Sequence, residues 1–353
     1  MTVRVQCPNC SSVCQVDDHH LGSAVQCGKC HKTFTLRPSV PGKANAPANP
    51  VSEEELLLVL DGPAAAALAA PAAAGSQSKP SPALTPSALP GVCCVDVAAA
   101  TSPGRARTRN EDSFLVQHVS WCSLDQRHEV ALVVVADGMG GHEAGDQASG
   151  LVIRTVGTAL AGLLGGAILG QRSDASLANL TDAVTGAIKE ANRAVYRQAQ
   201  TQPACRGMGA TAAVVLIWDG QAIIGHVGDC RVYRYSGEEL TQVTRDQTLV
   251  ARMVDLGKLS PREALTHPSR NEVAQAIGRH ADIAPGSYQV KLASGDWLIA
   301  ACDGLHAHVD ARMLEDAIRV AEPSAFYLSH HLVDLANQGG GSDNCTVVAI
   351  RCC

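Results

Sequence analysis

The stretch VALVVVADGMGGH, residues 130–142, indicates how the chain folds and where its chemistry lies. Its first seven residues are an unbroken apolar run, which is typical of a β-strand buried on both faces. Asp137 ends this run and opens a segment in which residues 138, 140 and 141 are glycines, the usual punctuation of a turn. The stretch therefore predicts a rigid buried strand that delivers a carboxylate to the end of a sheet.

Further strands and helices are expected on both sides of this strand. Strands are predicted at residues 211–218, 221–227, 231–235, 297–301 and 345–351, and another begins at Ser113. The turn Asp219-Gly220 joins the first two into a hairpin. Helices are predicted at residues 145–164, 176–200, 311–321 and 324–337. Strands interrupted by paired helices predict an α+β fold in which helices cover the sheets.

The composition narrows the class of protein. The chain has 353 residues, 46% of them hydrophobic and 18% charged, so it buries a sizeable core and is not disordered throughout, collagen-like or a coiled coil. Its net charge of −6 disfavours a protein that coats duplex DNA. The most apolar segment, residues 156–170, is short and rich in Gly and Ala, so we expect a buried helix and no membrane span. The sequence starts without a secretory signal pattern, so we expect its 14 cysteines to be reduced thiols in the cytoplasm.

Composition also divides the chain into three parts. Residues 1–38 form a cysteine-rich unit, and residues 93–353 have the pattern of one globular domain. Residues 39–92 between them are dominated by Pro, Ala, Ser and Gly, which cannot bury enough apolar surface to fold alone. We therefore expect a flexible linker between a small N-terminal unit and a large C-terminal domain.

Four cysteines of the N-terminal unit have the spacing of zinc ligands. They form two Cys-x2-Cys pairs, Cys7 with Cys10 and Cys27 with Cys30, separated by 16 residues. Two such pairs complete a tetrahedron of thiolates around one Zn²⁺, and a site closed in this way is structural. The segment resembles zinc ribbons at the N-termini of bacterial regulatory proteins, with a role in folding or in a protein contact. Spare candidate ligands, more simply interpreted as exposed residues without metal, are Cys14, His19, His20 and His31.

The C-terminal domain carries acidic residues at the ends of its predicted strands. These residues are Glu111, Asp112, Asp137, Asp303 and Asp343. Taken singly, each Asp-Gly pair is best interpreted as a turn, but buried carboxylates that converge repel one another strongly. Hard divalent cations such as Mg²⁺ or Mn²⁺ resolve this repulsion, and a pair of them acidifies a bound water. Taken together, the acidic residues predict a binuclear metal site.

Seven segments of the C-terminal domain follow one another in a characteristic order. They are GRARTRNEDS, VVADGMGGHEAG, RGMGAT, GHVGDCRVYRY, the run from LTQVTRDQ to NEVAQAIG, LIAACDGL and GGGSDNCTVV. Their order over residues 93–353 resembles the bacterial branch of the metal-dependent PP2C-type (PPM) serine/threonine protein phosphatases. The resemblance implies a β-sandwich of two mainly antiparallel sheets flanked by helices in α-β-β-α layers, with the metal site at one end.

The resemblance also implies which residues hold the two Mn²⁺ or Mg²⁺ ions. Asp137 matches the carboxylate that bridges both ions. Asp303 and Asp343 match the other ligands of the first ion. Glu111 and the backbone carbonyl of Gly138 match contacts of the second, partly through water.

Four further residues take their expected roles from the same resemblance. Asp112 would orient a metal-bound water, and Asp229 would help to hold a third, weaker ion. Arg107 matches the arginine that binds the substrate phosphate, although Arg105, Arg107 and Arg109 also read as a surface charge cluster. His142 is a candidate for leaving-group protonation or substrate contact, and a solvated loop histidine is an equal alternative.

The sequence departs from the family pattern in two places. Ala307 stands where many members carry an aspartate, which predicts a weaker third-ion site unless His306 or His308 compensates. Gln247 and Thr248 replace the usual His-Ser pair before the flap, residues 246–286. The flap of the family lies beside the active site, so we expect it to influence which phosphoproteins dock.

These features predict a hydrolase of phosphoserine and phosphothreonine in proteins that opposes Ser/Thr kinases. An activated water attacks phosphorus in line, without a phosphoenzyme, while Arg107 and both ions balance the developing charge. One alternative is a non-catalytic pseudophosphatase scaffold, which would lack the metal ligands. A second alternative is a zinc-ribbon regulator that binds nucleic acid, which the net acidity disfavours.

Overall fold

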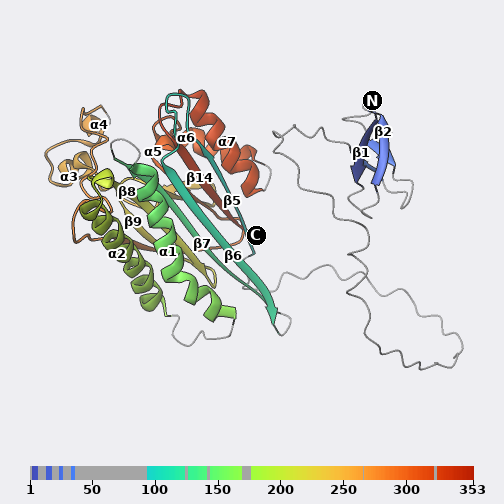
Figure 1. Cartoon of the computed structure of the whole chain (residues 1–353), viewed down its shortest axis with the longest axis horizontal. Helices are drawn as coiled ribbons and strands as arrows, with labels where there is room; N and C mark the ends of the chain where they lie inside the picture. The colour runs from blue at the N-terminus through green and yellow to red at the C-terminus, as the bar shows by residue number, and fades with distance from the viewer. Residues whose placement is uncertain are drawn as a thin grey trace, which may run out of the picture. The chain divides into compact units, whose positions relative to one another are not determined.

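The computed structural model describes residues 94–123, 126–140, 144–168, 176–264, 266–321 and 324–353, together with four short strands before residue 36. The chain divides into two compact units, residues 1–82 and 83–353 (Figure 1). The predicted linker, residues 39–92, and both of its boundaries lie outside the described residues.

The first unit contains two antiparallel strand pairs. β1 (Thr2–Gln6) pairs with β2 (Val13–Asp17), and β3 (Ala24–Gln26) pairs with β4 (Thr33–Thr35). In the sequence, one Cys-x2-Cys pair falls between the strands of each pair. The predicted zinc ligands Cys7, Cys10, Cys27 and Cys30 themselves lie outside the described residues.

The second unit contains two five-stranded antiparallel sheets. The first has the order β12-β9-β8-β7-β6, and the second β11-β10-β13-β14-β5. The first consists of β6 (Asp112–Ser123), β7 (Gln126–Met139), β8 (Gly209–Trp218), β9 (Gln221–Val227) and β12 (Gly286–Lys291). The second consists of β5 (Val95–Ser102), β10 (Arg231–Ser236), β11 (Glu239–Gln242), β13 (Trp297–Ala301) and β14 (Cys345–Cys352). The two antiparallel sheets with their helices confirm the predicted α+β fold.

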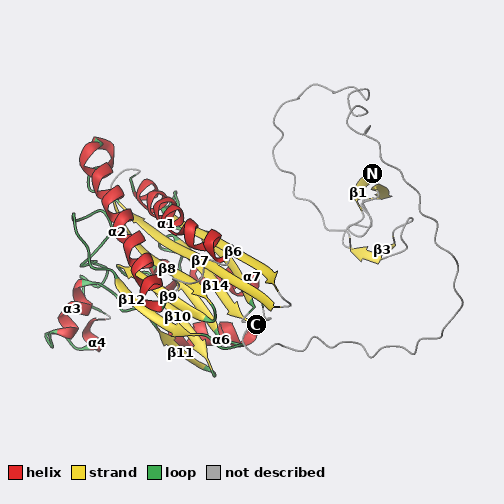
Figure 2. Cartoon of the chain, turned by 90° about the horizontal axis from the view of Figure 1, so that it is seen from below, coloured by secondary structure: helices red, strands yellow, loops and turns green. Residues whose placement is uncertain are grey.

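Helices cover the sheets, as Figure 2 shows. The long pair α1 (Gly145–Ile168) and α2 (Leu177–Thr201) packs on the first sheet, and α6 (Ala311–Val320) and α7 (Ala325–Gln338) pack on the second. Shorter segments are the 3₁₀ turn Pro203–Cys205, α3 (Leu249–Asp255), α4 (Pro261–Ala264) and α5 (Asp303–His306). Side-chain caps at Ser176 and Asp310 accept hydrogen bonds from Asn179 N (3.2 Å) and Met313 N (2.8 Å), which explains where α2 and α6 begin.

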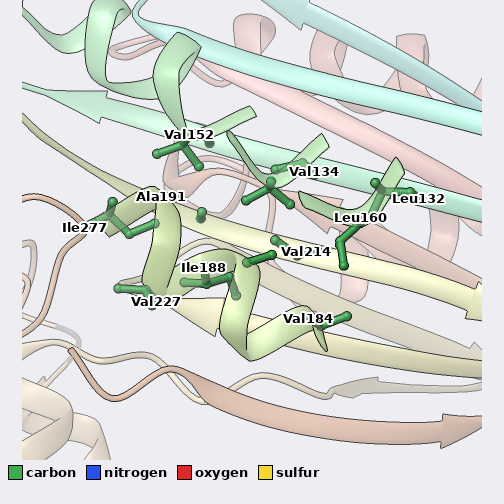
Figure 3. Packing of buried hydrophobic residues seen from close by; sticks show 14 of the residues in the cluster. Leu132, Val134, Val152, Leu160, Val184, Ile188, Ala191, Val214, Val227 and Ile277 are labelled. Atoms are coloured by element: carbon green, nitrogen blue, oxygen red, sulfur yellow. The ribbon is translucent and has the colours of Figure 1, made fainter. Parts of the chain in front are cut away.

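Strand β7 explains the apolar run that opened the sequence analysis. Its side chains alternate between two buried clusters, because successive residues of a strand point to opposite faces. Leu132 and Val134 pack against α1 and α2 (Figure 3), whereas Val133 and Val135 face the second sheet. A strand buried on both faces needs an apolar residue at every position, and residues 130–136 supply one.

Helix α1 is the one described helix that is long and apolar enough to cross a membrane, judged by length and composition alone. It begins at Gly145, eleven residues before the apolar segment singled out in the sequence. Its side chains at Val152 and Leu160 lie in the core cluster of Figure 3. Packing on the first sheet therefore accounts for the apolar face of this helix.

The contact between β9 and α2 is tight at one glycine. A Cβ atom at Gly225 would lie 2.5 Å from Cδ1 of Ile188 and 2.7 Å from Cγ1 of Val184. We expect Gly225→Ala to lower the free energy of unfolding by about 1–3 kcal/mol through overpacking. Gly186, in α2, has no atom within 4 Å of such a Cβ, so Gly186→Ala should raise it by up to about 1 kcal/mol. Denaturant unfolding of both variants checks this, and equal stability would contradict it.

Candidate active site

Acidic side chains from both sheets meet at one end of the second unit. Asp112 on β6 lies opposite Asp137 on β7, which lies opposite Thr211 on β8. In the other sheet, Asp303 follows β13 and Asp343 precedes its neighbour β14. A cavity of about 750 Å³ opens here. The predicted site residues that line it are Arg107, Glu111, Asp137, Gly138, Asp229, Asp303 and Asp343.

Two other predicted residues do not line this cavity as described. Asp112 lies beneath it, with its carboxylate almost entirely buried. His142 lies outside the described residues. The structure therefore brings together the predicted metal ligands and the predicted phosphate-binding arginine.

Close backbone packing fixes Glu111. Its backbone N–H donates to Asn344 Oδ1 (2.8 Å), and its carbonyl accepts from Ser149 Oγ (2.6 Å). A Cβ at Gly145 would lie 2.8 Å from the Glu111 carboxylate, and a Cβ at Gly138 would lie 2.1 Å from the Gly145 carbonyl. Only glycine fits at these positions, so α1 can begin directly against the site. Gly145 and Asn344 lie within the quoted motifs VVADGMGGHEAG and GGGSDNCTVV, yet the sequence alone predicted no role for either residue.

The carboxylate of Asp112 is held by two side chains of the second sheet. Its Oδ2 accepts hydrogen bonds from Thr346 Oγ1 (2.7 Å) and Cys302 Sγ (3.2 Å). Its Oδ1 is buried and has no hydrogen-bond partner among the described residues. Burial raises the pKa of Asp112 to about 6. An orphaned buried oxygen of this kind is costly, and it fits a site that receives another group.

Burial and repulsion between like charges also raise the pKa values of three other carboxyl groups. Burial raises the pKa of Asp137 well above its usual value, and the charge of Asp112 adds to this rise. Burial also raises the pKa of Asp303, while a hydrogen bond with Asp137 opposes that rise. For Asp229, burial and the charge of Asp303 raise the pKa to about 7. These groups cannot all ionise at neutral pH unless positive charge balances them.

The donor set fits hard divalent cations, because it consists of carboxylates and a backbone carbonyl. Within the described residues, however, no three His, Cys, Asp or Glu side chains gather around one point as ligands of an ion do. Internal partners explain this arrangement. Asp343 accepts from Arg107 Nη2 (2.8 Å) and from Asn344 N (2.9 Å), so neither of its oxygens is free. A cation bound to this carboxylate would compete with these two partners for its oxygens.

The three clustered arginines differ in their surroundings. Arg107 lines the cavity with its side chain 53% exposed, which suits a group that contacts substrate. Arg109 pairs with Asp146 at the start of α1 (2.8 Å) and does not line the cavity. The backbone N–H of Arg105 donates to the Gly341 carbonyl (2.7 Å). The structure thus separates Arg107 from its neighbours, which spacing alone could not do.

The two histidines that flank Ala307 were predicted as possible replacements for the missing aspartate. His306 Nε2 lies 3.2 Å from the backbone carbonyl of Asp229, and burial lowers the pKa of His306 to about 4. His308 Nε2 hydrogen-bonds Ser342 Oγ (2.8 Å). Both histidines therefore have partners other than the Asp229 carboxylate.

The segment predicted as the flap forms one wall of the cavity. Its base is tied down by Gln247, whose Oε1 accepts from Gly228 N (2.9 Å), and Thr248 caps α3. Asn192 of α2 holds its other end by accepting from Gly278 N (2.7 Å). Cavity-lining residues here that the sequence analysis missed are Asn271, Glu272, Arg279 and His280. Asn271 and Glu272 open the quoted motif NEVAQAIG, which could have indicated them, whereas Arg279 and His280 follow that motif.

We expect Mn²⁺ binding to weaken as the pH falls from 8 to 6. Cation ligands must be ionised, and the pKa values of Asp229, about 7, and Asp112, about 6, lie in this range, so protons compete with the ion. The affinity measured by calorimetry should fall by about tenfold or more. The Asp229→Asn variant should show a shallower dependence, and a wild-type affinity equal at both pH values would contradict the assignment.

Sequence comparisons place this geometry among known proteins. A model of the protein phosphatase 2C family matches residues 101–306. Protein phosphatase PhpP of Streptococcus pneumoniae is 32% identical over 256 residues, which are 72% of this chain and 97% of PhpP. Serine/threonine protein phosphatase PstP of Mycobacterium tuberculosis is 34% identical over 251 residues, 71% of this chain and 44% of PstP.

Solved structures agree with this placement. The Mycobacterium tuberculosis serine/threonine phosphatase PstP matches with a TM-score of 0.60 and 33% identity, covering 74% of this chain and 99% of that one. The PstP catalytic domain in complex with two manganese ions matches with a TM-score of 0.56 and 30% identity, again over 74% and 99%. On this evidence the chain belongs to the protein phosphatase 2C family.

Proposed function

We propose that the protein hydrolyses phosphoserine and phosphothreonine in proteins, with two Mn²⁺ or Mg²⁺ ions as cofactors. The observation that carries this proposal is the cavity in which carboxylates from both sheets face Arg107. When bound, the two ions would supply an acidified water as the nucleophile and balance charge on the phosphoryl oxygens. A family relative that crystallises with two manganese ions supports this choice of metal.

The residues of the chain would divide this work. Asp137, Asp303 and Asp343 would hold the ions, with Glu111 and the Gly138 carbonyl completing the second position. Asp112, fixed by Thr346 and Cys302, would orient the attacking water with its free oxygen. Arg107 would exchange Asp343 for the substrate phosphate, whose two oxygens match its planar fork. His142 remains a candidate for protonating the leaving serine or threonine oxygen, and Asp229 for holding a weaker third ion.

Two alternatives receive less support. A pseudophosphatase scaffold would lack metal ligands, yet all the predicted ligands of the two ions line one cavity. A zinc-ribbon regulator of nucleic acid would need a positive balance of charge, and the net charge is −6. We therefore propose phosphorylated proteins as partners, namely Ser/Thr kinases and the substrates of those kinases.

We also propose that residues 1–38 are a zinc ribbon, joined through a flexible linker, residues 39–92, to the phosphatase domain, residues 93–353. The spacing of the four cysteines and the antiparallel pairs β1-β2 and β3-β4 around them support the ribbon. Four zinc-binding thiolates need reduced cysteines, so this proposal carries a cytoplasmic location.

Replacing Asp137 tests the catalytic proposal. We expect Asp137→Asn to lower kcat toward a phosphopeptide in Mn²⁺ by about a thousandfold or more, since the amide cannot supply the bridging charge. The matched control is Asp219→Asn, at the other Asp-Gly pair, where a φ of 47° is one that asparagine tolerates. That control should retain wild-type turnover. Undiminished turnover in Asp137→Asn would refute the metal assignment.

Zinc analysis tests the N-terminal proposal independently. The purified wild-type chain should carry about one zinc, and Cys7→Ser/Cys27→Ser should carry none, because two of four thiolates are lost. Cys14→Ser should keep its zinc. Phosphopeptide turnover should be the same in all three proteins. A wild-type chain without zinc would contradict the zinc-ribbon proposal.

A further inference from the structure

A second hollow, separate from the catalytic cavity, lies between the two long helices that run side by side in Figures 1 and 2. Its volume is about 610 Å³. We call it the arginine furrow and define it by its lining residues, which are Arg154, Thr155 and Thr158 of α1 and Glu190, Arg193, Ala194 and Arg197 of α2. The furrow thus presents three guanidinium groups and two hydroxyls against a single carboxylate.

The side chains of the three arginines of the furrow are exposed. In the part of the chain that the structure describes, no ion pair or hydrogen bond is formed by the guanidinium groups of Arg154, Arg193 or Arg197. Other arginines of the domain behave differently, for example Arg231, which pairs with Asp246. Unpaired cations brought together repel one another, and an anion placed between them relieves that repulsion. The geometry points to an anionic ligand.

The furrow lies close to the catalytic cavity along both helices. Arg154 comes nine residues after Gly145, which touches Glu111, so it lies about 14 Å further along α1. On α2, the neighbour of Arg193 is Asn192, whose amide donates to the carbonyls of His280 (3.0 Å) and Ala281 (2.9 Å). Since His280 lines the catalytic cavity, a substrate peptide that leaves the cavity over His280 and Ala281 reaches the furrow.

We propose that the arginine furrow binds a second phosphoryl group of a multiply phosphorylated protein while the first occupies the catalytic cavity. The planar guanidinium groups of several arginines, with threonine hydroxyls beside them, suit a ligand that is a phosphate dianion better than a ligand that is a carboxylate. An extended chain covers about 3.3–3.6 Å per residue, so the two phosphorylated residues are separated by at least about four residues. This inference rests on the proposed phosphatase function and specifies its substrate class.

Paired peptides test the inference with the full-length protein in Mn²⁺. Each carries one phosphoserine, and half of them also carry a non-hydrolysable phosphonate analogue of phosphothreonine six residues before or after it. We expect the phosphonate to help on only one side of the phosphoserine. That peptide should have a KM about tenfold lower than the peptide without phosphonate, at unchanged kcat, because the furrow binds the ground state and the transition state equally. The variant Arg193→Gln/Arg197→Gln should lose this preference and retain its turnover of the singly phosphorylated peptide.

Controls separate charge from site. Lys291→Gln/Arg312→Gln removes two exposed cations outside the furrow and should keep the preference. The inference is overturned if the furrow variant keeps the preference, or if a glutamate at the phosphonate position lowers KM equally. Binding of the same peptides to Asp137→Asn, followed by fluorescence anisotropy, does not depend on turnover. If the phosphonate does not tighten binding to Asp137→Asn, or tightens it equally after Arg193→Gln/Arg197→Gln is added, the furrow inference is wrong. If the wild-type protein binds the peptides without hydrolysing them, the catalytic assignment is wrong.

Discussion

Repulsion between carboxylates is the constraint on which the active site depends. The fold places acidic groups from two sheets around one cavity, and burial raises the pKa values of most of them. A chain gains nothing in stability from such a cluster, because each ionised group loses hydration and faces like charges. Bound cations would balance the negative charges of the clustered carboxylates and so remove this repulsion. Within the described residues, Arg107 pairs with Asp343 and so balances one of these charges.

The scaffold holds these charges in place through backbone packing that leaves no room for adjustment. Antiparallel register sets Asp112 opposite Asp137, and the adjoining segments approach so closely that glycine is required at Gly138, Gly145 and Gly304. A Cβ at Gly304 would lie 1.9 Å from the Asn344 carbonyl, so α5 after β13 and the segment before β14 fit against each other. Neither Asp-Gly pair at the cavity is a turn, contrary to the interpretation of each pair taken singly, because Asp137 and Gly138 lie within β7 whereas Asp303 and Gly304 open α5. The glycine permits the close approach that puts the aspartate at the cavity.

Much of this could be predicted from the sequence, and the remainder depended on contacts between distant residues. The two-faced burial of β7, the helices α2, α6 and α7 and the acidic set follow from local patterns and ordered motifs. The support of Asp112 by Cys302 and Thr346 does not, because these side chains meet only when the second sheet lies against the first. The arginine furrow escaped notice for the same reason. Arg154 and Arg193 come from different helices, and no single segment shows that they converge.

Charge balance gives a physical reason why a two-ion core would not need a carboxylate in place of Ala307. Six carboxyl groups lie in or beneath the cavity, those of Glu111, Asp112, Asp137, Asp229, Asp303 and Asp343. Two divalent cations and the Arg107 guanidinium would leave this set one negative charge from neutrality. An aspartate at position 307 would add a further negative charge beside Asp229. Without that aspartate, two ions would bring the site within one charge of neutrality, so charge balance alone would favour a third ion only weakly.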